Sequence, residues 1–190
     1  RIEKKKDLVQ SINTEILTLI NEKKTILVTG HRRENFGNAF EEICRALVII
    51  ADRTDVQIIY PVHLNPNVQE PVTRILSGHT NIHLVQPQNY LNFVYLMIHS
   101  FFIITDSGGI QEEAPALGKP VLVLRDVTER TEGLDAGTIK LVGADKNNIT
   151  DEAFKLLDDK LTYKTMSNAH NPYGDGQASS RIMEKLISEH

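Results

Sequence analysis

A buried-strand pattern at residues 101–105 is followed by Ser107, Gly108 and Gly109, with Glu113 one helical turn later. The pattern predicts a strand, a tight turn and a helix N-terminus. Glycines let the backbone approach a ligand closely, and the free N–H groups of a first helical turn attract phosphate. Glu113 projects from the same helical face as Gly109, and its carboxylate can accept both hydroxyls of a ribose. Phosphate beside ribose indicates a nucleotide, and the lack of a Walker Gly-Lys-Ser/Thr sequence argues against an ATP-hydrolysing loop.

A second polar cluster occupies residues 29–37, which follow another predicted strand. His31 could donate a hydrogen bond to a phosphate or move a proton near neutral pH, and Arg32 can grip phosphate oxygens with two N–H groups. Structural roles are the alternative, with Asn35 capping the next helix and Glu34 pairing with one arginine. The number of polar groups at one strand end favours function. The spacing lacks a Gly-x-Gly-x-x-Gly fingerprint, which disfavours a dinucleotide site.

Three further loops contribute candidates. His63 lies between two prolines, where a structural role is favoured over a catalytic one. Gln88 and Phe93 suit the edge and face of a flat base, although a capped helix with Tyr90 and Phe93 in the core explains the pattern equally well. Arg130 can neutralise a diphosphate, and a surface ion pair is the alternative in a loop so rich in both charges.

Short Val- and Ile-rich runs alternate with helix-period segments, which predicts a parallel sheet wrapped by helices. We expect strands at 25–29, 56–60, 82–85, 101–105, 120–124 and 138–141. We expect helices at 38–53, 66–77, 90–99, 110–117 and 150–159, after an amphipathic helical pattern that begins at Leu8. This is a doubly wound, mostly parallel α/β domain of the Rossmann-like kind, in which ligands bind at the carboxyl ends of the strands. The polar candidate residues of the loops described above all fall at those ends.

Composition limits the possible function classes. A chain of 190 residues suits one domain, and a formal net charge of −4 with scattered Lys and Arg gives no basic stripe, so nucleic acid is not an expected partner. The single cysteine, Cys44, lies in an apolar pattern that predicts a buried core thiol. The histidines lack metal-ligand spacing, and neither a metal nor another cofactor is expected. No apolar run approaches the ~20 residues that span a membrane, so a cytoplasmic location is the default.

Both ends of the chain suggest a larger protein. The sequence begins at Arg1 without a methionine, from which we infer a piece of a longer chain. Residues 171–176 are dense in turn formers and precede a helical segment at 178–188. This helix could leave its own domain or dock on it, and the two alternatives have about equal weight. The chain therefore divides into a domain at 1–170 and a turn with a terminal helix at 171–190.

The motifs together strongly resemble the non-hydrolysing UDP-N-acetylglucosamine 2-epimerases. They run in order across nearly the whole chain as TGHRREN, PVHLNP, TDSGGIQEEAP, GKPVL, TER and NPYGDGxASxRI. The resemblance implies an enzyme with two Rossmann-like domains facing a cleft, as in GT-B glycosyltransferases, and a homodimer at full length. This chain would be the C-terminal, nucleotide-binding half, with its tail helix crossing to an N-terminal domain. One departure is Thr131, where members often have proline.

The resemblance also implies roles for individual residues. It assigns His31 to the catalytic cleft, beside the diphosphate. The implied UDP contacts are Gln88 and Phe93 at the uracil, Glu113 at the ribose, and Ser107, Gly108, Gly109 and Arg130 at the diphosphate. Positions like Arg32 and His63 touch a second, activating UDP-N-acetylglucosamine molecule in some bacterial members.

The implied reaction interconverts UDP-N-acetylglucosamine and UDP-N-acetylmannosamine by removal of the C2 proton, elimination of UDP and its re-addition to the opposite face. This route needs an acid/base pair and strong stabilisation of the departing diphosphate. The family's catalytic carboxylates belong to the N-terminal domain, so we expect this chain alone to hold UDP with little or no turnover. The alternatives are a hydrolysing epimerase that releases free N-acetylmannosamine, a GT-B glycosyltransferase donor domain, and a nucleotide-binding module without chemistry.

Overall fold

A parallel sheet organises the part of the chain that the computed structural model describes, residues 11–188. Its six strands lie in the order β3-β2-β1-β4-β5-β6, and every neighbouring pair is parallel. The strands are β1 (Lys24–Thr29), β2 (Val56–Pro61), β3 (Ile82–Val85), β4 (Phe102–Thr105), β5 (Val121–Val123) and β6 (Ile139–Leu141). The expected doubly wound α/β fold is confirmed, and each predicted strand is present with ends shifted by at most one residue.

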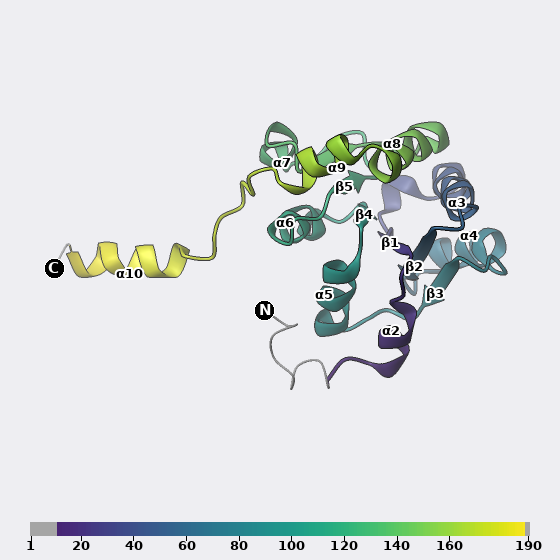
Figure 1. The fold of residues 1–190 in the computed structure, drawn as a ribbon, viewed down its shortest axis with the longest axis horizontal. Coiled ribbons are helices and arrows are strands. Elements are labelled where there is room, and N and C mark those ends of the chain that lie inside the picture. Colours follow the sequence, from purple (N-terminus) through teal and green to yellow (C-terminus); the bar gives the residue numbers. More distant parts are fainter. Residues whose placement is uncertain (1–10, 189–190) are drawn as a thin grey trace.

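Helices cover both faces of this sheet (Figure 1). The helices of the described residues are α2 (Thr14–Leu19), α3 (Asn38–Ala51), α4 (Pro66–Leu76), α5 (Tyr90–His99), α6 (Gly108–Ala116), α7 (Thr131–Asp135), α8 (Lys146–Asp158), α9 (Lys160–Ser167) and α10 (Ala178–Ser188), with a 3-10 helix η1 (Arg33–Asn35) before α3, and all but α10 belong to the domain around the sheet. All of the predicted helices are present. The helical pattern expected at the start of the chain contains α2, while its first residue, Leu8, lies outside the described residues.

The apolar runs in the strands arise because both faces of the sheet are buried. Ile26 and Val28 of β1 pack into a core cluster that includes residues of α3, α4 and α8. Leu27, between them, packs into a second cluster that includes residues of α2, α5 and α6. Successive side chains of a strand point to opposite faces, so a strand covered on both sides is apolar at most of its positions. Cys44 of α3 is fully buried in the first cluster, as predicted, and burial is the main cause that raises the pKa of its thiol to about 12.

Two helices begin earlier than predicted, and two short helices were not predicted. α8 begins at Lys146 because the Asp145 side chain accepts a hydrogen bond from the Asn148 amide at 2.7 Å and caps the helix there. α6 begins at Gly108, so both glycines of the predicted turn belong to the helix. α7 and α9 have 5 and 8 residues, which is too short to show a helical period clearly.

The strand order reverses at β1. From β1 the chain moves outward through β2 to β3 and then returns to the other side of β1 to form β4. The last residues of β1 and β4, Thr29 and Thr105, are partners in the sheet, and their hydroxyl oxygens lie 2.6 Å apart. In an open α/β sheet, ligands bind in the crevice outside such a reversal point. The polar cluster predicted at residues 29–37 and the turn predicted at residues 107–109 both lie here.

The C-terminal helix α10 extends away from the domain (Figure 1). None of its residues is buried, and its apolar side chains are largely exposed, namely Ile182 (59%), Met183 (54%), Leu186 (55%) and Ile187 (70%). The helix therefore does not dock on its own domain, and its crossing to a second domain stays a prediction. Within residues 11–188, no helix has the length and apolar character needed to cross a membrane.

Candidate functional site

A pocket of about 220 Å³ opens at the point where the strand order reverses. Its lining comes from the loops after β1, β2, β3 and β4, namely Thr29, Gly30, His31, Pro61, His63, Pro87, Gln88, Phe93, Ser107 and Ile110. The structure thus brings together five of the predicted site residues from four separate segments of the chain. The other predicted residues, Arg32, Gly108, Gly109, Glu113 and Arg130, do not line the pocket itself.

The start of α6 presents backbone N–H groups at this edge of the sheet. Ser107 is the N-cap residue, but its side chain makes no capping hydrogen bond, so the first-turn amides can serve an anion. Gly108 is buried, and a Cβ atom at this position would lie 2.9 Å from Cζ of Arg130. The missing side chain is therefore what allows the Arg130 guanidinium to lie against the helix start.

Arg130 is held at the helix start by two carboxylates. Its Nε and Nη2 atoms each lie 2.9 Å from Glu112 Oε1, and its Nη1 atom lies 3.5 Å from Glu129 Oε2. The ion pair that was the alternative to phosphate binding is thus present. The two roles are compatible, because the same contacts place the guanidinium against Gly108 and its side chain remains 30% exposed. Arg130 is positioned to meet an anion at the first turn of α6.

Glu113 and Tyr90 form a hydrogen bond between α6 and α5. The Tyr90 hydroxyl donates to Glu113 Oε2 at 2.7 Å, and this bond is the main cause that raises the pKa of Tyr90. Tyr90 is 69% exposed, so the interpretation that placed it in the core is wrong. It stands at the first residue of α5, at the open edge of the sheet, where a carboxylate lies within reach. Sequence reasoning missed this pair because no spacing rule connects residues 90 and 113.

Phe93 and Gln88 form one wall of the pocket. Phe93 is partly buried and packs against the second core cluster, so its position is compatible with both a core role and contact with a base. Gln88 is fixed by two hydrogen bonds: its Nε2 donates to the Gln86 carbonyl at 2.7 Å, and its Oε1 accepts from Asn92 Nδ2 at 3.0 Å. A side-chain amide held in this way can read the edge of a flat ligand.

Buried polar contacts fix the loop after β1. The backbone amides of His31 and Arg32 both donate to Asp106 Oδ2 at 2.8 Å. Asn35 is only 5% exposed and donates from Nδ2 to a backbone carbonyl just after β5. The structural alternative expected Asn35 to cap α3, but Gly37 occupies the N-cap position. Sequence reasoning also missed Asp106, although an acidic residue directly after a buried, mainly apolar strand is a signal that could have found it.

The two predicted histidines lie side by side. The rings of His31 and His63 stack with centroids 5.2 Å apart and planes 15° apart. His63 Nδ1 accepts a hydrogen bond from the Asn65 amide at 3.1 Å, which fits the structural role favoured for it, and its ring also lines the pocket. Among residues 11–188, no group of three or more His, Cys, Asp or Glu side chains is arranged to hold a metal ion.

Glu34 pairs with two arginines rather than with the one that the sequence suggested. Its Oε2 lies 3.8 Å from Nη1 of Arg32, and its Oε1 lies 3.2 Å from Nε of Arg125. Arg125 also donates to Glu129 at 2.8 Å, and this hydrogen bond is the main cause that lowers the pKa of Glu129 to about 2. Arg32 therefore takes part in a charged network beside the pocket.

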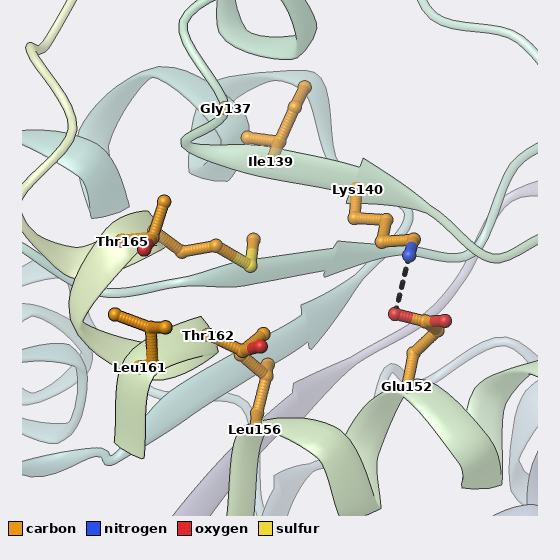
Figure 2. Close-up of a pocket in the computed structure, with 9 residues that line it drawn as sticks. Gly137, Ile139, Lys140, Glu152, Leu156, Leu161, Thr162 and Thr165 are labelled. Carbon is orange, nitrogen blue, oxygen red and sulfur yellow. Dashed lines mark ion pairs between the residues drawn. The ribbon is translucent and has the colours of Figure 1, made fainter. Parts of the chain in front are cut away.

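A larger hollow of about 460 Å³ lies between β6, α8 and α9 (Figure 2). Leu156 and Met166 contribute to its mainly apolar walls, and its charged pair, Lys140 and Glu152, has an N–O distance of 2.6 Å. Burial alone would raise the pKa of Glu152, but hydrogen bonds from Lys140 and Lys155 hold it below its ordinary value. None of the predicted site residues lines this hollow. Its charges already satisfy each other, so the pocket at the strand reversal is the better candidate.

Comparison with known proteins decides the family. The family model described as UDP-N-acetylglucosamine 2-epimerase matches residues 2–187. The chain belongs to this family. A UDP-N-acetylglucosamine 2-epimerase from Escherichia coli is 65% identical over 166 residues, which are 87% of this chain and 44% of that protein. The resemblance stated from the sequence is confirmed.

Solved structures show how much of such an epimerase this chain represents. The crystal structure of UDP-GlcNAc 2-epimerase from Neisseria meningitidis bound to UDP-GlcNAc has a TM-score of 0.90 at 44% identity, over 98% of this chain and 50% of that chain. The chain thus spans about half the length of the epimerases that it matches. WaaG, a glycosyltransferase involved in lipopolysaccharide biosynthesis, has a TM-score of 0.64 at 17% identity, over 90% of this chain and 48% of that chain. That likeness concerns the fold alone, and it agrees with one half of a GT-B-like two-domain enzyme.

Proposed function

We propose that this chain is the UDP-binding half of a UDP-N-acetylglucosamine 2-epimerase that interconverts UDP-N-acetylglucosamine and UDP-N-acetylmannosamine. Family membership supports the epimerase assignment, and a relative of the same fold was solved bound to UDP-GlcNAc. One observation carries the UDP-binding role: the N-terminus of α6, the guanidinium of Arg130 and the carboxylate of Glu113 converge where the strand order of a parallel sheet reverses.

The arrangement of these groups suits the successive parts of UDP. The uracil would lie against Phe93 with its edge toward Gln88, both of which line the pocket. The ribose hydroxyls would donate to Glu113, which Tyr90 already holds through a hydrogen bond of 2.7 Å. The diphosphate would accept hydrogen bonds from the first-turn amides of α6 and from Arg130. The negative charge of the ligand thus meets the positive end of the helix dipole and a guanidinium together.

The reaction divides between this chain and a second domain. Elimination of UDP requires stabilisation of the departing diphosphate, which the α6 amides and Arg130 would supply. His31 lines the pocket and could move a proton or donate a hydrogen bond to that diphosphate. Removal of the C2 proton needs carboxylates that we assign to the other half of the protein, so this chain alone would bind UDP without turning over the sugar nucleotide. Arg32 and His63 would face a second, activating molecule of the substrate.

Two measurements test the proposal. Isothermal titration calorimetry of this chain with UDP is expected to show saturable binding at one site, with ADP at the same concentration as the control for base selectivity. An NMR assay of a longer protein containing this sequence is expected to show conversion of either sugar nucleotide into the other. Failure to bind UDP would overturn the binding role, and appearance of free N-acetylmannosamine would select the hydrolysing alternative.

Tyr90 is expected to contribute to UDP affinity through Glu113. Tyr90→Phe removes the hydroxyl that donates to Glu113 Oε2, so the carboxylate is less well ordered for the ribose. We expect calorimetry to show weaker UDP binding by about 0.5–1.5 kcal/mol, the usual net worth of one hydrogen bond. Tyr163→Phe is the matched control, because the Tyr163 hydroxyl donates to the Phe101 carbonyl at 3.0 Å, outside the pocket. Tighter binding by Tyr90→Phe would show instead that the phenol competes with the ribose.

A further inference from the structure

Asp106 is a buried carboxylate that the UDP-binding role does not use. It follows β4 directly and has no exposed surface. Its Oδ2 atom accepts hydrogen bonds from the backbone amides of His31 and Arg32, both at 2.8 Å. These two bonds join the end of β4 to the loop after β1, across 75 and 74 positions of sequence. One carboxylate oxygen therefore fixes the backbone that carries His31.

The other oxygen of Asp106 has a different environment. Oδ1 is buried and has no hydrogen-bond partner among the described residues. It lies 3.6 Å from Nδ1 of His31. A buried carboxylate oxygen without a partner is costly, so a role for it is expected. The separation is slightly longer than a hydrogen bond, and such contacts in catalytic sites often tighten only when the ligand is bound.

The position of the His31 ring makes this contact directional. His63 stacks against one face of the ring, with centroids 5.2 Å apart and planes 15° apart. The His31 side chain is 45% exposed, so a small rotation about its side-chain bonds can shorten the separation from Asp106 while the backbone bonds to Oδ2 are kept. The two nitrogens of an imidazole point in different directions. When Nδ1 of a neutral ring keeps the proton and donates a hydrogen bond to a carboxylate, Nε2 is left as the free acceptor.

We propose that Asp106 is a positioning residue for His31. The Oδ2 atom of Asp106 holds the His31 backbone, and its Oδ1 atom accepts a hydrogen bond from the protonated Nδ1 of His31, so that Nε2 is presented to the pocket. The inference rests on the proposed function, in which His31 acts on the sugar nucleotide. A purely structural role is the alternative: Asp106 would then close the loop and have no influence on the ring. The two differ in what they predict for the tautomer of His31.

Asp106→Asn separates the two roles. The asparagine carbonyl can still accept from both backbone amides, but the side-chain NH2 then takes the place of Oδ1 and donates to Nδ1 of His31. The neutral imidazole must therefore carry its proton on Nε2 instead. Long-range 1H–15N NMR spectra of this chain, recorded at a pH where the ring is neutral, report the tautomer. We expect the proton on Nδ1 in the native chain and on Nε2 in Asp106→Asn.

Asn35→Ala is the matched control. The Asn35 side chain is buried and fixes the same loop through its hydrogen bond to the Leu124 carbonyl, rather than through the His31 ring. We expect Asn35→Ala to keep the native tautomer, whether or not the loop becomes more mobile. A proton on Nε2 in the native chain would overturn the proposal, and so would an unchanged tautomer in Asp106→Asn. If the variant does not fold, the native spectrum decides alone.

Turnover by a longer protein containing this sequence provides an independent readout. Asp106→Asn is expected to lower kcat by about tenfold to a hundredfold, with KM for the sugar nucleotide changed by about twofold or less. In a His31→Gln background, Asp106→Asn is expected to have no further effect, because its influence passes through the imidazole. Equal losses with and without His31 would overturn the proposal. UDP calorimetry of the native chain tests the proposed function separately, because it measures UDP binding without turnover and without substitution of Asp106.

Discussion

Replacing Arg130 with alanine is expected to weaken UDP binding by about 2–3 kcal/mol, roughly a 30- to 150-fold loss of affinity. The guanidinium lies against Gly108 at the start of α6, where it can donate charge-assisted hydrogen bonds to diphosphate oxygens. Its removal also leaves Glu112, whose Oε1 lies 2.9 Å from the native guanidinium, without a counter-charge beside the anion. The lost attraction between Arg130 and the diphosphate and the new repulsion between Glu112 and the diphosphate both lower UDP affinity. Calorimetry with UDP measures the sum.

Arg53→Ala is the matched control for this change. It removes the same charge from a surface site where Arg53 pairs with Asp55 at 2.9 Å and with Asp158 at 2.8 Å. Because exposed charges beyond about 10 Å are screened at ordinary salt, UDP affinity should stay within about twofold. Similar losses in both variants would show that Arg130 acts only through net charge, which would contradict its placement at the diphosphate.

Gly108→Ala tests the same contact without deleting the arginine. A Cβ atom there would lie 2.9 Å from Cζ of Arg130 and 3.1 Å from both terminal nitrogens. The end of an arginine side chain is flexible, so the guanidinium should move while the fold is kept. We expect about a tenfold loss of UDP affinity, with no loss of thermal stability because alanine favours a helix over glycine. Native affinity in this variant would show that the position of the guanidinium does not matter.

Glu113→Ala is expected to weaken UDP binding by about 1–3 kcal/mol, because the ribose hydroxyls lose a charged acceptor. The loss should exceed that of Tyr90→Phe, since Tyr90 acts on the ribose only through the carboxylate that it contacts at 2.7 Å. Combining the two substitutions should therefore add little to Glu113→Ala alone. Glu113→Gln keeps one acceptor oxygen without the charge, so its affinity should fall between those of the native chain and the alanine variant.

Glu70→Ala is the control for the loss of a carboxylate. Glu70 is exposed on α4, where it pairs with Arg74 at 2.6 Å, and it does not line the pocket. Calorimetry should give the native UDP affinity for this variant. Unchanged affinity in Glu113→Ala as well would remove Glu113 from the ribose site and leave the base and the diphosphate as the recognised parts.

The architecture could be predicted because its signals are local. Strands buried on both faces are apolar at most positions, and the run that forms β4 stops at the sheet edge, where Asp106 and Ser107 follow. Parallel strands have their carboxyl ends at one edge, so the convergence of His31, Gln88 and Ser107 on one pocket followed from topology alone. For the secondary structure, the differences lay at element ends and in short helices, where a single cap such as Asp145 outweighs periodicity.

Only the tertiary structure decided which side chains meet within that edge. The bonds from His31 to Asp106 and from Tyr90 to Glu113 join residues 75 and 23 positions apart, and they depend on strand order and helix placement. The contact between Arg130 and Gly108 likewise requires the loop after β5 to reach the start of α6. The sequence by itself determined the sheet and the loops at its carboxyl edge, because apolar runs and turn residues act over a few positions. Pairing, burial and orientation of the polar groups were decided in three dimensions, because each depends on neighbours that the chain brings together only when it folds.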